Sequence, residues 1–159
     1  MNRTYIRRPH IIIEILSYAV ILMSLIAAIY LCMTVDGEIP THMKIDGTVD
    51  EYGSVYSSLV VPIIMLFTNG MLSLMMHFYP VTRWNLPVKV TNPEKAPYVY
   101  NDCVWLMVLI MLLMGVMTLG MTVGTFFGGT AMTIGAAVPC IAMFAIIIVY
   151  IVKMIKDNR

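Results

Sequence analysis

Charged side chains are scarce in this sequence. Only 12% of its 159 residues are charged, about half the share found in an average soluble domain. Hydrophobic residues make up 60% of the chain, and the mean hydropathy is +0.85. A net charge of +1 also argues against nucleic-acid binding. This composition indicates an integral membrane protein.

Catalytic signatures are missing as well. The sequence contains no glycine-rich phosphate loop, no G-x-S-x-G or H-E-x-x-H motif, and no Cys/His pair with catalytic spacing. Cys32, Cys103 and Cys140 lie in or beside different apolar runs and show no C-x-x-C spacing, so we interpret them as buried thiols. The sequence therefore predicts a protein that is not an enzyme and that needs neither a cofactor nor a metal ion.

What the chain does contain is four long apolar runs. A hydrocarbon layer about 30 Å thick is crossed by about 20 helical residues. Backbone groups in lipid must bond within their own segment, so such runs become helices. We predict an all-α membrane protein, a single domain over 1–159 with four transmembrane helices. The predicted spans are 11–33, 55–79, 103–127 and 131–152.

The basic residues predict the orientation of these spans. They precede the first run, lie between the second and third, and follow the fourth, whereas Lys44 is the only one between the first and second. Because Lys and Arg near span ends stay in the cytoplasm, we expect both termini and loop 80–102 there, with loop 34–54 outside. The first run is too long for a typical signal-peptide core and is interpreted as a membrane anchor.

Two polar residues within the spans are candidate binding residues. Glu14, about one turn into the first run, could be a proton or cation site. The favoured interpretation is a structural carboxylate near the helix N-terminus, bonded to His10 or to nearby arginines. Asn69, near the middle of the second span, should face protein and bond another helix, with a ligand-lining role as the alternative.

Glycines recur along the third span at Gly115, Gly120, Gly124 and Gly128. Spacings of four place small residues on one helix face, which allows another helix to approach closely. The small residues Ala131 and Gly135 of the fourth span make that span the favoured partner, and a second copy of the chain is the alternative.

The polar segment 39–54 has turn-forming glycines and ends at Ser54, a plausible N-cap for the second span. Within it, His42, Asp46 and Asp50 are four residues apart, which could bring an imidazole and two carboxylates together. A divalent cation is one interpretation. A structured loop with Asx-turns is favoured, and recognition of a partner or peptide is the third interpretation.

This segment follows the pattern P-x-H-x-N-x-x-G-x-x-D-x-Y/W-G-S. The matching residues are Pro40, His42, Gly47, Asp50, Tyr52, Gly53 and Ser54, while Lys44 stands where Asn is usual. A second match is the Asn/Pro segment 85–91 before the third span. In these motifs the chain resembles small bacterial membrane proteins carrying the uncharacterised domain of the SdpI-type toxin-immunity proteins.

The resemblance implies a multi-pass protein of the bacterial cytoplasmic membrane that takes part in immunity or signalling. Our first hypothesis is that the outer loop binds an extracellular peptide or toxin through His42, Asp46, Asp50 and Tyr52. The alternative is a small transporter or transporter subunit, lined by Glu14 and Asn69, or else a membrane assembly scaffold. Beyond the lipid bilayer, the expected partners are the peptide and either further copies of the chain or another membrane protein.

Overall fold

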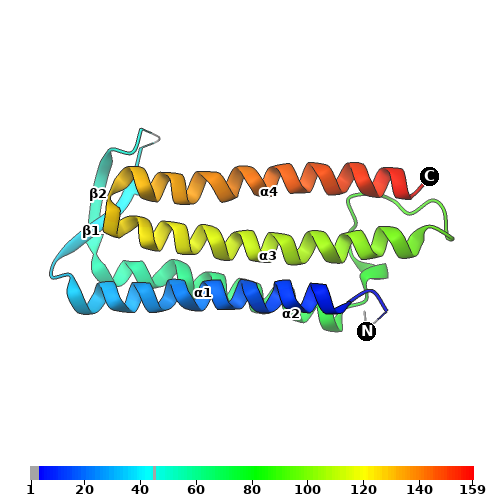
Figure 1. Ribbon diagram of the computed structural model, residues 1–159, viewed down its shortest axis with the longest axis horizontal. Coiled ribbons are helices and arrows are strands. Elements are labelled where there is room, and N and C mark those ends of the chain that lie inside the picture. Colours follow the sequence, from blue (N-terminus) through cyan, green and yellow to red (C-terminus); the bar gives the residue numbers. More distant parts are fainter. Residues whose placement is uncertain (1–3, 45) are drawn as a thin grey trace.

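Four long helices lie side by side in the computed structural model, which describes residues 4–44 and 46–159 (Figure 1). They are α1 (Arg8–Thr34), α2 (Val60–Phe78), α3 (Ala96–Phe127) and α4 (Gly129–Asp157). The short 3₁₀ helix η1 (Val55–Leu59) leads directly into α2. With η1 counted into the second, all four are long and apolar enough to cross a membrane, which confirms the four-helix prediction.

The third helix begins earlier than the predicted span start at 103. Pro97 occupies its first turn, where a proline needs no N–H, and residues 98–102 continue the helix. Between α2 and α3 the chain forms a second 3₁₀ turn, η2 (Val81–Arg83), followed by an irregular segment. The predicted loop 80–102 is therefore partly helical.

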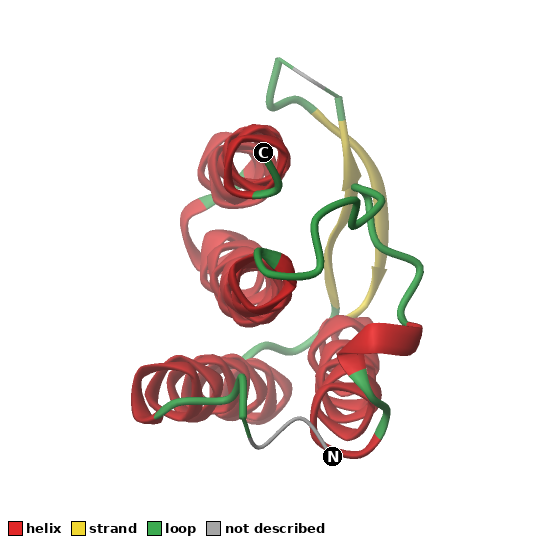
Figure 2. Ribbon diagram, turned by 90° about the vertical axis from the view of Figure 1, so that its right-hand side faces the viewer, coloured by secondary structure: helices red, strands yellow, loops and turns green. Residues whose placement is uncertain are grey.

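Helix α3 is the centre of the bundle. It packs against α1, α2 and α4, while α4 packs mainly against α3 (Figure 2). Glycine makes the α3–α4 contact close: a Cβ added at Gly120 would lie 2.7 Å from the carbonyl oxygen of Gly135, and one added at Gly124 would lie 2.4 Å from the Cα of Met132. The predicted packing of the fourth helix on the glycine face of the third is confirmed within one chain.

Gly115 does not belong to that contact. A Cβ there would lie 3.1 Å from the carbonyl oxygen of Ser17 on α1. The glycine repeat thus serves two neighbours, because Gly115 lies five residues before Gly120 and so faces a different side of the helix.

Segment 38–54, which the sequence predicts only as a structured loop, is a β-hairpin. Strands β1 (Glu38–Met43) and β2 (Val49–Ser54) are antiparallel, and Ile39 lies opposite Gly53. The register shifts after Pro40, which cannot donate to the ladder. Ser54 then caps η1 by accepting a hydrogen bond from the Tyr56 backbone N–H at 3.4 Å. Two strands are therefore added to the helical fold.

The hairpin lies at one end of the bundle and both chain termini lie at the other (Figure 1). We call these the hairpin end and the termini end. Nearly all described basic residues belong to the termini end: Arg7, Arg8, Arg83, Lys89, Lys95, Lys153, Lys156 and Arg159. Five acidic residues belong to the hairpin end: Asp36, Glu38, Asp46, Asp50 and Glu51. The other four acidic residues, Glu14, Glu94, Asp102 and Asp157, belong to the termini end, so the two ends differ in net charge.

Candidate functional site

One face of α1 brings polar side chains into the core of the bundle. Its buried residues recur at spacings of three and four, as expected for a helix face turned towards its neighbours. They are His10, Glu14, Ser17, Ile21, Ser24, Ala28 and Leu31. More than half of this face is polar, so the interior of this apolar protein is not uniformly apolar.

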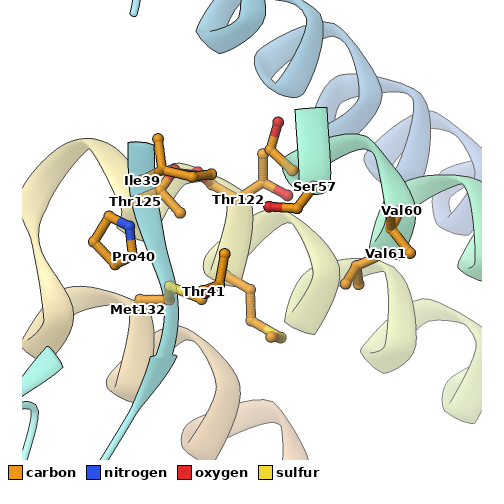
Figure 3. A pocket seen from close by; sticks show the side chains of 11 residues that line it. Ile39, Pro40, Thr41, Ser57, Val60, Val61, Thr122, Thr125 and Met132 are labelled. Atoms are coloured by element: carbon orange, nitrogen blue, oxygen red, sulfur yellow. Dashed lines mark hydrogen bonds between the residues drawn. The ribbon is translucent and has the colours of Figure 1, made fainter. Parts of the chain in front are cut away.

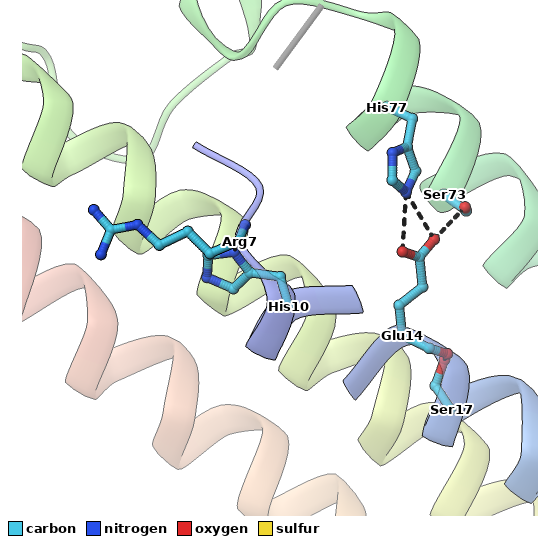
Figure 4. Close-up of polar contacts among 6 residues, drawn as sticks. All are labelled: Arg7, His10, Glu14, Ser17, Ser73 and His77. Carbon is cyan, nitrogen blue, oxygen red and sulfur yellow. Dashed lines mark hydrogen bonds and ion pairs between the residues drawn. The ribbon is translucent and has the colours of Figure 1, made fainter. Parts of the chain in front are cut away.

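The Glu14 carboxylate binds two side chains of α2. Its two oxygens lie 2.9 and 3.2 Å from His77 Nε2. The Ser73 hydroxyl, one turn earlier on α2, donates to the same carboxylate (Figure 4). The side chain of Glu14 is 7% exposed and that of His77 is 36% exposed. The buried carboxylate of Glu14 is therefore paired with the partly exposed imidazole of His77.

The predicted partners of Glu14, His10 and the arginines, are wrong. His10 Nδ1 instead accepts a hydrogen bond from the Arg7 backbone N–H at 2.9 Å. The His10 ring packs edge-on against Trp105 of α3, with centroids 4.4 Å apart. Glu14 and His10 thus lie on the same buried face of α1 but bind different groups (Figure 4).

Asn69 faces protein, as predicted. It is fully buried, and its Nδ2 donates to Ser17 Oγ at 3.3 Å and to the Met111 carbonyl oxygen at 3.4 Å. Its Oδ1 has no partner among the described residues. Further along the bundle, the hydroxyls of Ser24 and Thr122 bond each other at 2.8 Å.

These buried and half-buried polar groups lie along one seam between α1, α2 and α3, in two hydrogen-bonded sets that the buried Ile21 separates on α1. We call it the polar seam. It consists of Glu14, Ser17, Ser24, Asn69, Ser73, His77 and Thr122. Ionisable groups at membrane depth are costly and usually have a function. The Glu14–His77 pair is the ionisable part of the seam and can hold or exchange a proton.

The hairpin brings together two of its predicted binding residues. His42 Nδ1 lies 2.7 Å from Asp50 Oδ1. Asp46 does not join them, because its carboxylate accepts hydrogen bonds from the Thr48 hydroxyl and backbone N–H in an Asx-turn. These two hydrogen bonds, with that of the side chain first, lower the pKa of Asp46. Tyr52 is 57% exposed on β2.

The pairing arises across the two strands and not on a helix face. Among residues 4–44 and 46–159, His, Cys, Asp and Glu side chains nowhere gather in a group of three that could hold a metal ion. The arrangement at the hairpin is therefore a single imidazole–carboxylate pair, and the exposed Tyr52 lies two residues further along β2, opposite Pro40.

The hairpin is pressed against the turn between α3 and α4. A Cβ added at Gly129 would lie 2.2 Å from the carbonyl oxygen of Gly47, and one added at Gly47 would lie 2.8 Å from Thr130 Oγ1. Gly47 has a φ of +83°, which favours glycine. Ile39 is buried with Leu31 and Val55 at the base of the hairpin. The hairpin is thus held at both its tip and its base.

Two apolar pockets lie under the hairpin. One, of about 260 Å³, lies between β1, η1 and α3 and is lined by residues that include Ile39, Val61 and Thr122 (Figure 3). The other, of about 410 Å³, lies between β1, α3 and α4 and includes His42, Met117 and Met121. The sequence gives no direct signal for these pockets, because they depend on where the hairpin folds back.

A buried ion pair at the termini end was also missed. Asp102 of α3 is 1% exposed and binds Lys153 of α4. Nearby, Asn158 Nδ2 donates to the Lys89 carbonyl oxygen at 2.9 Å, and its Oδ1 accepts from the Thr91 backbone N–H at 3.0 Å. Val99, Cys103 and Val104 are apolar and buried around Asp102, and their helical spacing was the signal that could have placed this residue in the bundle.

Comparison with known proteins gives no family for this chain: no protein-family model matches it, and no curated protein or solved structure does so either.

Proposed function

We propose that this protein is a non-enzymatic membrane protein that binds a cationic, amphipathic peptide at its hairpin end. In this proposal the hairpin lies outside the cytoplasmic membrane of a bacterium, and the protein acts in immunity or signalling, as its resemblance to SdpI-type proteins implies. The observation that carries the proposal is the hairpin itself. It is fixed against the α3–α4 turn and covers two apolar pockets at the acidic end of the bundle.

Charge and surface chemistry support this choice of ligand. The segment 36–54 carries five acidic residues, four of them in the hairpin itself, and Lys44 is its only basic residue. Such a field attracts cations and speeds their association. The pockets beneath are lined by apolar groups, and the flexible side chains of Met117, Met121 and Met132 adapt to ligands of varied shape. A peptide with basic and aliphatic side chains matches both features.

Thr122 provides a route from the pocket to the interior. Its side chain lines the pocket beneath β1 and its hydroxyl bonds Ser24 of the polar seam. A side chain that enters this pocket would contact Thr122 and alter that hydrogen bond. We propose that the bound state is relayed in this way past the buried Ile21 to the rest of the seam, towards the termini end.

Binding can be measured with the full-length protein in lipid nanodiscs and a synthetic amphipathic peptide rich in leucine and lysine. The Asp50→Asn and Glu51→Gln substitutions each remove a charge from the hairpin. Each should weaken binding about two- to fivefold, the equivalent of up to about 1 kcal/mol for an exposed charge pair. Glu94→Gln is the matched control, because it removes an exposed acidic charge at the other end. Equal affinity for all variants would reject the hairpin as the binding site.

Transport of protons or small cations is the second candidate. The observation that favours it is the Glu14–His77 pair within the polar seam. A chain of four helices is small for a transporter, so this function would require oligomers. Proteoliposomes with an enclosed pH-sensitive dye would report proton flux. Glu14→Gln and Asn69→Leu should abolish or strongly reduce the flux, and Glu94→Gln should leave it unchanged. Absent flux, or flux unchanged by the first two substitutions, would exclude this candidate.

A further inference from the structure

A third pocket lies at the termini end, far from the hairpin, and we call it the groove. It has a volume of about 360 Å³ and is formed by the last turns of α2, the first half of α3 and residues 83–87. Its α3 wall consists of Cys103, Leu106, Met107 and Ile110, which recur at helical spacing. Met75 and Tyr79 form the opposite wall. The groove is a long apolar slot between two helices.

The segment above the groove is held in place. Val81 of η2 is fully buried and packs with Val99, Cys103 and Met154. The indole N–H of Trp84 donates to the Tyr79 carbonyl oxygen at 3.0 Å. Because Tyr and Trp side chains favour the boundary between lipid and water, we expect the mouth of the groove at the depth of the lipid headgroups.

Arg83 lies at this mouth. Its side chain is exposed, and it forms no ion pair with any residue that the structure describes. The exposed amide of Asn85 also borders the groove. A guanidinium presents several N–H donors in a planar fork that suits a phosphate group. The groove therefore combines an apolar slot with a cationic rim whose N–H donors suit a phosphate group.

We propose that this groove binds one anionic phospholipid, with the phosphate at Arg83 and an acyl chain along α3 between Leu106 and Ile110. Charge complementarity selects this occupant. The termini end carries eight of the described basic residues, against the acidic Glu14, Glu94, Asp102 and Asp157. Basic pockets beside transmembrane helices are suited to anionic headgroups, whereas a zwitterionic lipid offers no net charge to match. The proposal is independent of peptide binding at the hairpin.

The test uses Trp84 as the reporter in the full-length Trp105→Phe protein, so that Trp84 is the only tryptophan. Its fluorescence is measured in bilayers that contain phosphatidylglycerol or phosphatidylcholine with brominated acyl chains, because bromine quenches a tryptophan that it contacts. Phosphatidylglycerol should quench Trp84 at a lower mole fraction than phosphatidylcholine does. Arg83→Gln should reduce this preference about fivefold, as expected for the loss of one basic residue at the membrane surface.

Two further variants distinguish lipid binding in the groove from a general attraction of anionic lipid to the basic end of the protein. Lys156→Gln removes one exposed basic charge from the same end but outside the groove, and it should leave the preference unchanged. Ile110→Phe places a larger side chain in the slot without adding a second tryptophan. It should reduce quenching by both lipids. Thermal unfolding identifies variants that remain folded. Equal preference in the parent and Arg83→Gln proteins, or an equal loss in Lys156→Gln, would overturn the proposal.

Discussion

Backbones approach each other closely at the hairpin end, where glycines bring Gly129 against Gly47 and Gly124 against Met132. At the termini end, polar side chains join the segments in addition to the apolar packing of Val81, Val99 and Met154. Asp102 binds Lys153 across α3 and α4, and Asn158 binds the backbone of the segment that connects α2 to α3. The hairpin end is acidic and the termini end is basic.

This difference bears on what each end can do. Contacts between backbones leave no space for adjustment, so they hold the hairpin in a fixed shape, which suits a surface that recognises a ligand. Side-chain bonds at the termini end join loops to helices without such close approach. Substitutions at each end can test whether the two ends depend on these two kinds of contact.

Gly124→Ala should have the largest effect. The added Cβ would lie 2.4 Å from the Cα of Met132, so α3 and α4 must move apart. We expect the free energy of unfolding in mild detergent to fall by about 3 kcal/mol. Gly70→Ala is the matched control, because nothing lies within 4 Å of its added Cβ, and it should be neutral or stabilising by about 0.5–1 kcal/mol. Similar losses of unfolding free energy in both variants would show that the close contact between α3 and α4 does not explain the loss in Gly124→Ala.

Lys153→Met should have the next largest effect. It leaves the Asp102 carboxylate buried without its cation. Because the Lys153 side chain is 49% exposed, the pair is partly screened. We therefore expect a loss of about 1–2 kcal/mol in the free energy of unfolding. Lys156→Met should change it by less than about 0.5 kcal/mol. If the two lysine variants unfold alike, the buried pair does not stabilise this end.

Asn158→Ala should have a smaller effect. It removes the hydrogen bonds to Lys89 and Thr91, and the free energy of unfolding should fall by about 1 kcal/mol. Hydrogen exchange should show faster exchange of the Thr91 amide, while the amides of the hairpin are unchanged. If the hairpin amides also exchange faster, the stability of the hairpin end depends on the contacts at the termini end.

The smallest effect concerns the pH response of the hairpin. Two hydrogen bonds from Thr48 lower the pKa of Asp46, so they stabilise the turn above the pKa of the unfolded chain. This contribution is lost as the pH falls through the lower, folded pKa. Thr48→Val removes the hydroxyl donor and should raise the pKa of Asp46 towards its usual value, measured by NMR titration of the carboxyl carbon. An unchanged pKa would mean that the backbone donor alone is responsible.

The sequence predicted what depends on local pattern. Length and hydropathy placed the four helices, and the spacing of Gly120 and Gly124 predicted a closely packed neighbour. The burial of Asn69 followed from the cost of exposing an amide to lipid. None of these predictions needs the relative rotation of the helices.

The sequence could not predict which distant residues meet. The pairing of Glu14 with His77 depends on how α1 and α2 are rotated against each other, whereas the sequence pattern favours partners that are near in the chain, such as His10. Likewise, the spacing of His42, Asp46 and Asp50 fits a helix, but the chain folds into a hairpin that pairs only the first and third. Asp102 and Lys153 fell at the edges of predicted spans, where the apolar pattern is weakest.

We propose that the two ends lie on opposite sides of the membrane, with the hairpin end outside. Single cysteines can test it in a chain whose Cys32, Cys103 and Cys140 are replaced by serine or alanine. Lys44→Cys reports the hairpin end and Glu94→Cys the termini end, and both positions are exposed. In intact cells, a membrane-impermeant maleimide should label position 44 and should label position 94 only after the cells are opened. Labelling of position 94 in intact cells would contradict the account.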